Sequence, residues 1–232
     1  MPDTSNDLGL AEARTAAPTL HRTLAAGAGG HDVARLQAEL RTAGLTPGAI
    51  DGIFGDRTTT AVIAFATRED LTPVDGTVDV ALWSAILAAG ARARADALEA
   101  AARAHEQAAD AAHDAAGAAQ QLAVDQRSKA IPAGPNEEGA AGQLILAAQH
   151  WRAAAAQWLA VAEVLAPHAD PEGRSYKAHA RHWNALDQAR AHAKRTVNSL
   201  ALAGKDFDTA GVTDHRERLA RATLAARDLA AT

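Results

Sequence analysis

The chain has no cysteine among its 232 residues. It can therefore form neither a disulfide framework nor a thiolate metal site, and it offers no cysteine nucleophile. Aromatic residues make up only 3% of the chain, and no apolar run approaches the length of a membrane-spanning helix. Roughly a quarter of the residues are alanine, which forms helices readily but buries little area, so the sequence predicts thin cores and closely spaced helices.

Concentrated positive charge is also missing. The formal net charge is −5, from 28 acidic and 23 basic residues, and no block of lysine or arginine stands out. A nucleic-acid surface needs such a block, so we expect no nucleic-acid partner. The start of the chain, residues 1–8, is acidic and polar, unlike a secretory signal with its basic start and apolar stretch. We therefore expect the chain to be made and held in the cytoplasm.

The pattern along the chain divides it into three parts. Residues 1–19 are rich in Ala, Thr, Pro and Asp without a clear apolar face, which favours a flexible leader. Residues 20–88 carry three short helical repeats separated by two Asp-Gly turns, which predicts a compact three-helix domain. Residues 89–232 carry four longer alanine-rich repeats, which predicts an up-down four-helix bundle. The expected fold class is all-α.

Aspartate and glycine are placed at the expected helix ends of the small domain. Asp32 and Asp56 each precede a helical repeat of apolar residues, and both are predicted to be N-caps. Gly44 is placed to end the first helix. The third helix is expected to begin near Asp79.

The bundle is expected to contain helices at about 91–128, 139–166, 172–203 and 212–230, with loops at 131–136, 167–171 and 204–208. The first of them is either separate from the last helix of the small domain or a direct continuation of it. Heptad-like spacing predicts their inward faces, which include Leu122, Leu144, Trp151, Trp158 and Trp183. The three tryptophans are expected to pack in the core, and the alternative is an exposed aromatic stripe for a partner. A coiled-coil oligomer through the first helix is left open.

Several linked motifs follow one another between about residues 24 and 86. They are Gly30-His31-Asp32-Val33-Ala34-Arg35-Leu36-Gln37, Asp51-Gly52-Ile53-Phe54-Gly55-Asp56-Arg57-Thr58, Ala61-Val62-Ile63-Ala64-Phe65, and Asp75-Gly76-Thr77-Val78 with Trp83. In this order the segment resembles the small helical peptidoglycan-binding domains of bacterial and phage cell-wall proteins. The resemblance implies three helices and binding of peptidoglycan or a wall fragment. Ala66 and Leu82 depart from the family's usual glutamine and threonine, which bears on polar contacts with the ligand.

Most of these motif residues are expected to be structural. Phe54, Val62, Phe65 and Trp83 are predicted to lie in the core, Gly52 and Gly55 to adopt angles that a side chain would forbid, and Asp51 to bond its own turn. The resemblance points to candidate ligand-binding residues: Asp51, Gly52, Phe54, Gly55, Asp56, Arg57, Thr58, Thr59, Asp75 and Gly76. The surface beside the turn at 51–58 is expected to offer backbone N–H groups and hydroxyls to the peptide stem or sugar of a wall fragment.

No catalytic constellation is recognisable in the remainder. Zinc-peptidase, phosphate-loop and Gly-x-Ser-x-Gly patterns are absent from the sequence. Four histidines could form a metal site across the bundle: His150, His179, His182 and His192. The Glu-x-x-His pairs of such sites are missing, so we expect surface or interface histidines, no metal and no cofactor. Glu137, Glu138 and Glu163 have no spacing that suggests glycoside cleavage, and no catalytic residue is predicted.

Together these patterns predict a non-enzymatic wall-binding or anchoring protein. Its bundle would act as a spacer, a scaffold or a docking surface for a protein partner. One alternative is a component or cargo of a phage-like or contractile injection particle that targets it to the wall. Another is a secreted effector with an unrecognised active site in the bundle. In each case, wall contact would need lysis, injection or another non-classical export route.

Overall fold

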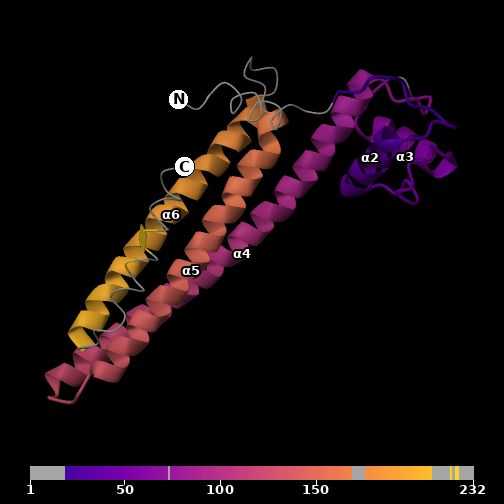
Figure 1. The fold of residues 1–232 in the computed structure, drawn as a ribbon. Helices are drawn as coiled ribbons and strands as arrows, with labels where there is room; N and C mark the ends of the chain where they lie inside the picture. The colour runs from indigo at the N-terminus through magenta and orange to yellow at the C-terminus, as the bar shows by residue number, and fades with distance from the viewer. Residues whose placement is uncertain (1–18, 73, 169–175, 211–219, 221–222, 225–232) are drawn as a thin grey trace, which may run out of the picture. The chain divides into compact units, whose positions relative to one another are not determined.

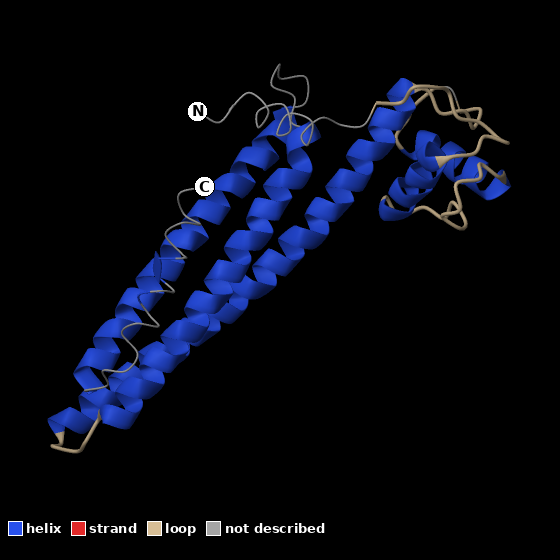
Figure 2. Ribbon diagram, viewed as in Figure 1, coloured by secondary structure: helices blue, strands red, loops and turns tan. Residues whose placement is uncertain are grey.

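The computed structural model describes residues 19–72, 74–168, 176–210, 220 and 223–224. The helices recorded among them are α2 (His31–Thr42), α3 (Asp56–Arg68), α4 (Val80–Ser128), α5 (Gly134–Leu165) and α6 (Tyr176–Ala210), as Figure 1 shows. A short 3-10 helix, η1 (Ala166–His168), follows α5. The same residues contain no strand and only isolated β-bridges (Figure 2). The prediction of an all-α fold is therefore confirmed.

Contacts divide the chain into two compact units, which we describe separately. Unit 1 comprises the described residues of Met1–Asp96 and Glu163–Ala180, and unit 2 those of Ala97–Ala162 and Arg181–Thr232. Helices α4, α5 and α6 each contribute residues to both units. The predicted domain division after residue 88 was drawn from motifs and composition rather than from contacts, and it stays a prediction.

Unit 1 folds around large apolar side chains that recur at helical spacing. Its core contains residues from α2, α3, the start of α4 and the segments between them: Leu20, Leu24, Val33, Leu36, Leu40, Phe54, Val62, Phe65, Val78, Leu82, Trp83, Ile86 and Leu87. Burying a side chain of this size contributes about 1.5–3 kcal/mol. The predicted core positions Phe54, Val62, Phe65 and Trp83 are confirmed, since none is more than 3% exposed.

Two helix ends of unit 1 form as predicted. Gly44 follows α2 with a φ of 86°, and the N–H of Leu45 bonds back to the carbonyl oxygen of Leu40 at 2.9 Å. This left-handed residue with its backward hydrogen bond is a common way to end a helix at glycine. At the start of α4, the Asp79 carboxylate accepts a hydrogen bond from the N–H of Leu82 at 2.8 Å. Asp79 is therefore the N-cap of α4.

The predicted N-caps Asp32 and Asp56 are wrong. Helix α2 begins at His31 and α3 at Asp56 itself, and the residue before each helix is a glycine without a side-chain cap. Asp32 lies in the first turn of α2, where its carboxylate is 2.8 Å from the Arg22 Nε. That hydrogen bond is the main cause that holds the pKa of Asp32 below its ordinary value. The aspartate thus ties the segment before α2 to the helix instead of capping it.

Unit 2 contains parts of α4, α5 and α6 that lie side by side and alternate in direction (Figure 1). Hydrogen-bond contacts join each pair of helices. They are Trp158 Nε1 to Glu106 at 2.7 Å, Gln120 to Asp206 at 2.6 Å, and His182 Nδ1 with the carbonyl oxygen of Ala162 at 2.9 Å. The predicted inward face of the middle helix is confirmed, because Leu144, Trp151 and Trp158 are all buried.

The predicted inward faces of α4 and α6 are confirmed only in part. Three predicted positions are buried, namely Ala112 on α4 and Ala193 and Leu200 on α6. On α4, however, four other buried alanines form a seven-residue repeat one residue away from the predicted positions: Ala102, Ala109, Ala116 and Ala123. Leu122, which we predicted to face inward, is 55% exposed, and Trp183 of α6 is 49% exposed. A shift of one residue turns a helix face by about 100°. The physical reason is that alanine occurs on every side of these helices. The few large residues therefore do not indicate reliably which side faces inward.

The bundle boundaries also need correction. The first bundle helix is continuous with the last helix of the small domain, because α4 runs unbroken from Val80 to Ser128. The segment 204–208, which we predicted to be a loop, is part of α6. The predicted leader at 1–19 and the predicted fourth helix at 212–230 fall outside the described residues, apart from 19, 220 and 223–224. Across the described helices, none has the length and apolar character needed to span a membrane.

Candidate functional site

Two aspartate loops of unit 1 have the same local structure. The Asp51 carboxylate accepts a hydrogen bond from the N–H of Ile53 at 2.9 Å, and the Asp75 carboxylate accepts one from the N–H of Thr77 at 2.9 Å. The side chain of Gln37 is the main cause that lowers the pKa of Asp51, and the hydroxyl of Thr77 is the main cause for Asp75. These turns fix their own backbone. The predicted role of Asp51 in its turn is confirmed.

Each loop requires its glycine. Gly52 has a φ of 74° and Gly76 has a φ of 82°, where side chains are disfavoured. A Cβ at Gly52 would also lie 2.9 Å from the carbonyl oxygen of Gly30, and one at Gly76 would lie 2.7 Å from Thr59 Cγ2. Gly55 differs, because its φ is −95° and a Cβ there would meet open space. The predicted conformational need for glycine at position 55 is therefore wrong.

A buried glutamine amide anchors the first loop to α2. Gln37 is 1% exposed, and its Nε2 donates to the Asp51 carboxylate and to the carbonyl oxygen of Ile53, both at 3.0 Å. Its Oε1 accepts from the N–H groups of Asp51 at 3.1 Å and Gly52 at 3.0 Å. The sequence places Gln37 within a helical repeat, and its anchoring role was not predicted from that repeat. The available signal was a polar residue at an inward position of an apolar repeat.

The backbone N–H groups of residues 51–55 in the first loop all donate hydrogen bonds to groups within the domain. The N–H groups of residues 51 and 52 bond to Gln37, and that of Ile53 bonds to Asp51. The N–H of Phe54 donates to Ala28 at 2.8 Å, and that of residue 55 donates to Ile53 at 3.0 Å. The prediction that this turn offers free N–H groups is therefore wrong for residues 51–55. A loop packed into a domain must satisfy its own polar groups.

An open pocket of about 690 Å³ lies beside this loop, between the end of α2 and the start of α3. It is lined by Arg41, Leu45, Thr46, Gly48, Asp56, Arg57 and Thr60. Arg41 reaches across its wall, where Nη2 donates to the carbonyl oxygen of Gly48 at 2.6 Å. The lining combines hydroxyl groups with charges of both signs, which suits a small polar ligand.

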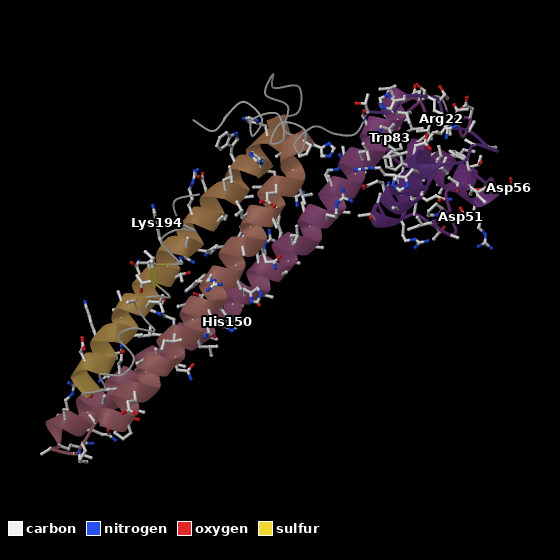
Figure 3. All side chains as sticks on the ribbon, viewed as in Figure 1. Arg22, Asp51, Asp56, Trp83, His150 and Lys194 are labelled. Carbon is white, nitrogen blue, oxygen red and sulfur yellow. The ribbon has the colours of Figure 1, made fainter. Side chains whose placement is uncertain are left out.

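The predicted ligand-binding residues lie in three different places: the pocket lining, the core and the loops. Asp56 (Figure 3) and Arg57 line the pocket. Phe54 lies in the core, and the buried Thr58 hydroxyl donates to the carbonyl oxygen of Pro47 at 3.2 Å. The others belong to the loops or pack against them and do not line the pocket: Asp51, Gly52, Gly55, Thr59, Asp75 and Gly76. Ligand binding at these positions stays a prediction.

Sequence reasoning missed five residues of the pocket lining: Arg41, Leu45, Thr46, Gly48 and Thr60. The segment 46–52 was interpreted only as a turn, and Arg41 carried no motif signal. These residues come together because α2 ends next to the beginning of α3, which is a tertiary contact. The signal that could have found them is the run of turn residues directly after a predicted helix end.

Histidines of unit 2 contact side chains of neighbouring helices. His105 Nδ1 of α4 lies 3.3 Å from His150 Nδ1 of α5 (His150 is labelled in Figure 3). His192 is 2% exposed, stacks on Trp151 at 5.1 Å between ring centroids, and places Nε2 2.8 Å from a Glu106 oxygen. Over the part of the chain that the structure describes, no group of three or more His, Cys, Asp or Glu residues could hold a metal ion.

Helices α2 and α3, the start of α4, two aspartate–glycine loops and the polar pocket form a small helical domain within unit 1. Residues 29–86 match the family model described as "Putative peptidoglycan binding domain", so the chain contains a domain of this family. The match covers about a quarter of the chain. No curated protein and no solved structure matches the chain.

Proposed function

We propose that the chain binds peptidoglycan through the pocket between α2 and α3. The observation that carries this proposal is that the open pocket lies within the segment that matches the peptidoglycan-binding family. Its wall is shaped by the Gln37 anchor, which fixes the loop that precedes α3. The pocket is small and open, so affinity for one short fragment is weak, and retention on the wall depends on many binding events along a polymer.

We further propose that unit 2 is a non-catalytic spacer, scaffold or docking part. This proposal is supported by the polar side chains of unit 2, which join its helices to one another. The Glu106 carboxylate contacts both Trp158 and His192, and His105 contacts His150. Polar contacts between helices are typical of a structural network.

The proposal is tested by co-sedimentation of the full chain with purified cell-wall sacculi. A Thr60→Trp variant places a large ring in the pocket, and we expect binding to fall at least to about a tenth of the wild-type level. Thr67→Trp is the matched control. Both threonines are exposed on α3 and donate to the carbonyl oxygen four residues earlier, but Thr67 does not line the pocket. Absence of sedimentation by the wild-type chain would disprove wall binding.

The non-catalytic role has its own test. The full chain is incubated with sacculi, and the soluble fraction is analysed for released muropeptides and sugars. We expect no release above a sample without protein. Release that increases with protein concentration and persists in the Thr60→Trp variant would show an enzymatic activity outside the pocket and overturn this part of the proposal.

A further inference from the structure

The pocket of unit 1 presents two adjacent side chains of opposite charge. Asp56 and Arg57 are consecutive at the start of α3, both are exposed, and both line the pocket. Among the described residues, no ion pair or side-chain hydrogen bond engages either group. Arg41, near the end of α2, also lines the pocket and uses one guanidinium N–H on the carbonyl oxygen of Gly48. The remaining N–H groups of its planar fork can reach a ligand.

Glycine keeps this charged wall accessible. Gly48 has a φ of 94°, and a Cβ there would lie 3.3 Å from Arg57 Cδ. The arginine stem therefore packs directly against the backbone of the turn at residue 48. This contact limits the directions that the guanidinium can take and places it at the edge of the pocket.

The lining residues favour a peptide ligand over a sugar ring. Protein sites that hold pyranose rings commonly place an aromatic face against the ring, but none of the described residues that line this pocket is aromatic. The large aromatic side chains of the domain are instead buried in its core: Phe54, Phe65 and Trp83. Peptidoglycan combines uncharged glycan strands with peptide stems that carry free carboxylates and, at a diamino acid, a free amine. Arginine pairs with carboxylates through parallel hydrogen bonds, and aspartate pairs with an ammonium group.

We infer that the pocket recognises a charged end of the peptide stem, with its carboxylate on Arg57 and Arg41 and its ammonium group on Asp56. This inference rests on the proposed wall binding and specifies which part of the polymer is bound. The groups are exposed, so salt screens their attraction. Binding therefore weakens as salt concentration rises, and the glycan contributes little to it.

The first experiment separates the stem from the glycan. The full chain is passed over two sets of beads, one carrying covalently attached glycan strands with their stems and the other carrying glycan strands from which an amidase has removed the stems and whose exposed lactyl carboxylates are capped as amides. We expect binding to the strands with stems and at least a tenfold loss on the stripped strands. Equal binding to both would overturn the stem inference and leave wall binding intact. Binding to neither would disprove the proposed function itself.

The second experiment assigns each charge by modifying both partners. Arg57→Gln should weaken binding to native sacculi about tenfold, because it removes charge-assisted hydrogen bonds. On sacculi whose carboxylates have been converted to amides, the same substitution should have little effect. Asp56→Asn should weaken binding to native sacculi but not to sacculi whose amines have been acetylated. Such cycles isolate one pairwise contact.

Arg35→Gln is the control for Arg57→Gln. Arg35 is an exposed arginine on α2 that does not line the pocket, so its loss changes the net charge equally without touching the site. It should bind all sacculi like the wild type. If Arg35→Gln and Arg57→Gln weaken binding equally, binding depends on general charge attraction and not on a specific contact of Arg57. If the losses for Arg57→Gln and Asp56→Asn persist on the modified walls, the assigned contacts are wrong.

Discussion

The two units bury different kinds of side chain. Unit 1 places leucine, phenylalanine and tryptophan in its core, and its two loops are held by aspartate, glycine and one glutamine amide. The helix contacts of unit 2 are made largely by alanine, with Trp151 and Trp158 as the main large groups. A large side chain has few places where it fits, whereas an alanine fits on any face of a helix. The cost of changing a residue should therefore differ sharply between the units.

The largest effect is expected in the core of unit 1. Phe65 is fully buried on α3, and Phe65→Ala should cost about 3–5 kcal/mol because the lost ring leaves a cavity. Hydrogen exchange of the full chain should show faster exchange in peptides from residues 31–68 and unchanged exchange in those from 134–162. Thr67→Ala, at an exposed site on the same helix, is the control. Equal acceleration in both regions would show that the units do not unfold separately.

The next effect tests the inward face of α4. Ala123 is fully buried, so Ala123→Leu should overfill the contact and cost about 1–3 kcal/mol. Its neighbour Leu122 is 55% exposed, and Leu122→Ala should change stability by no more than about 0.5 kcal/mol. Thermal unfolding followed by circular dichroism compares the two. If Leu122→Ala cost more stability than Ala123→Leu, the inward face of α4 would be the one that contains Leu122, as the sequence predicted.

The same contrast explains what the sequence could predict. In unit 1 the helices, the core and both loops followed from residues whose chemistry allows few alternatives, such as Gly52 in its left-handed conformation. In unit 2 the face of α5 followed from Trp151 and Trp158, because two indoles two helical turns apart define one side. The faces of α4 and α6 followed only in part: Ala193 and Leu200 are buried as predicted, whereas Leu122 and Trp183 are exposed on alanine-rich helices.

The candidate site was less predictable than the fold that carries it. Asp56 and Arg57 were found because they belong to a motif. Arg41 and Gln37 were missed as functional or anchoring residues because their roles depend on contacts with segments more than a few residues away. The Gln37 amide contacts Asp51 across fourteen positions of sequence, a proximity that helical periodicity does not encode.

A pair of glycine substitutions sharpens the comparison within the first loop. Gly52→Ala should cost about 1–2 kcal/mol for the left-handed backbone, with a further penalty from the carbonyl oxygen of Gly30 at 2.9 Å. Gly55→Ala should cost less than Gly52→Ala, because its backbone angles suit alanine and the space is open, so that only the poorer capping by alanine opposes it. Chemical denaturation of the full chain, followed by hydrogen exchange in peptides around the loop, measures both. A loss at position 55 as large as that at 52 would contradict the assigned conformations.

The smallest effect is a pH dependence expected in unit 2. Burial is the main cause that lowers the pKa of His192, and Arg195 on its own helix acts in the same direction, while Glu106 and Asp110 of α4 oppose the shift. The folded state therefore favours the neutral ring more than the unfolded state does. Stability from this group is complete above the unfolded value of about 6.5 and is lost as the pH falls below it toward the folded pKa.

Melting temperatures at several pH values between 8 and 5 should show this loss in the wild type and a shallower one in His192→Gln. His113→Gln, which removes an exposed histidine of α4, should keep the wild-type slope. The comparison uses slopes because His192→Gln also disturbs the stacking on Trp151 and the contact with Glu106 at every pH. An unchanged slope in His192→Gln would mean that the ring changes charge as readily inside the bundle as in the unfolded chain. The buried polar contacts of unit 2 would then be tolerant of charge, as the Asp51 loop of unit 1 is of its carboxylate.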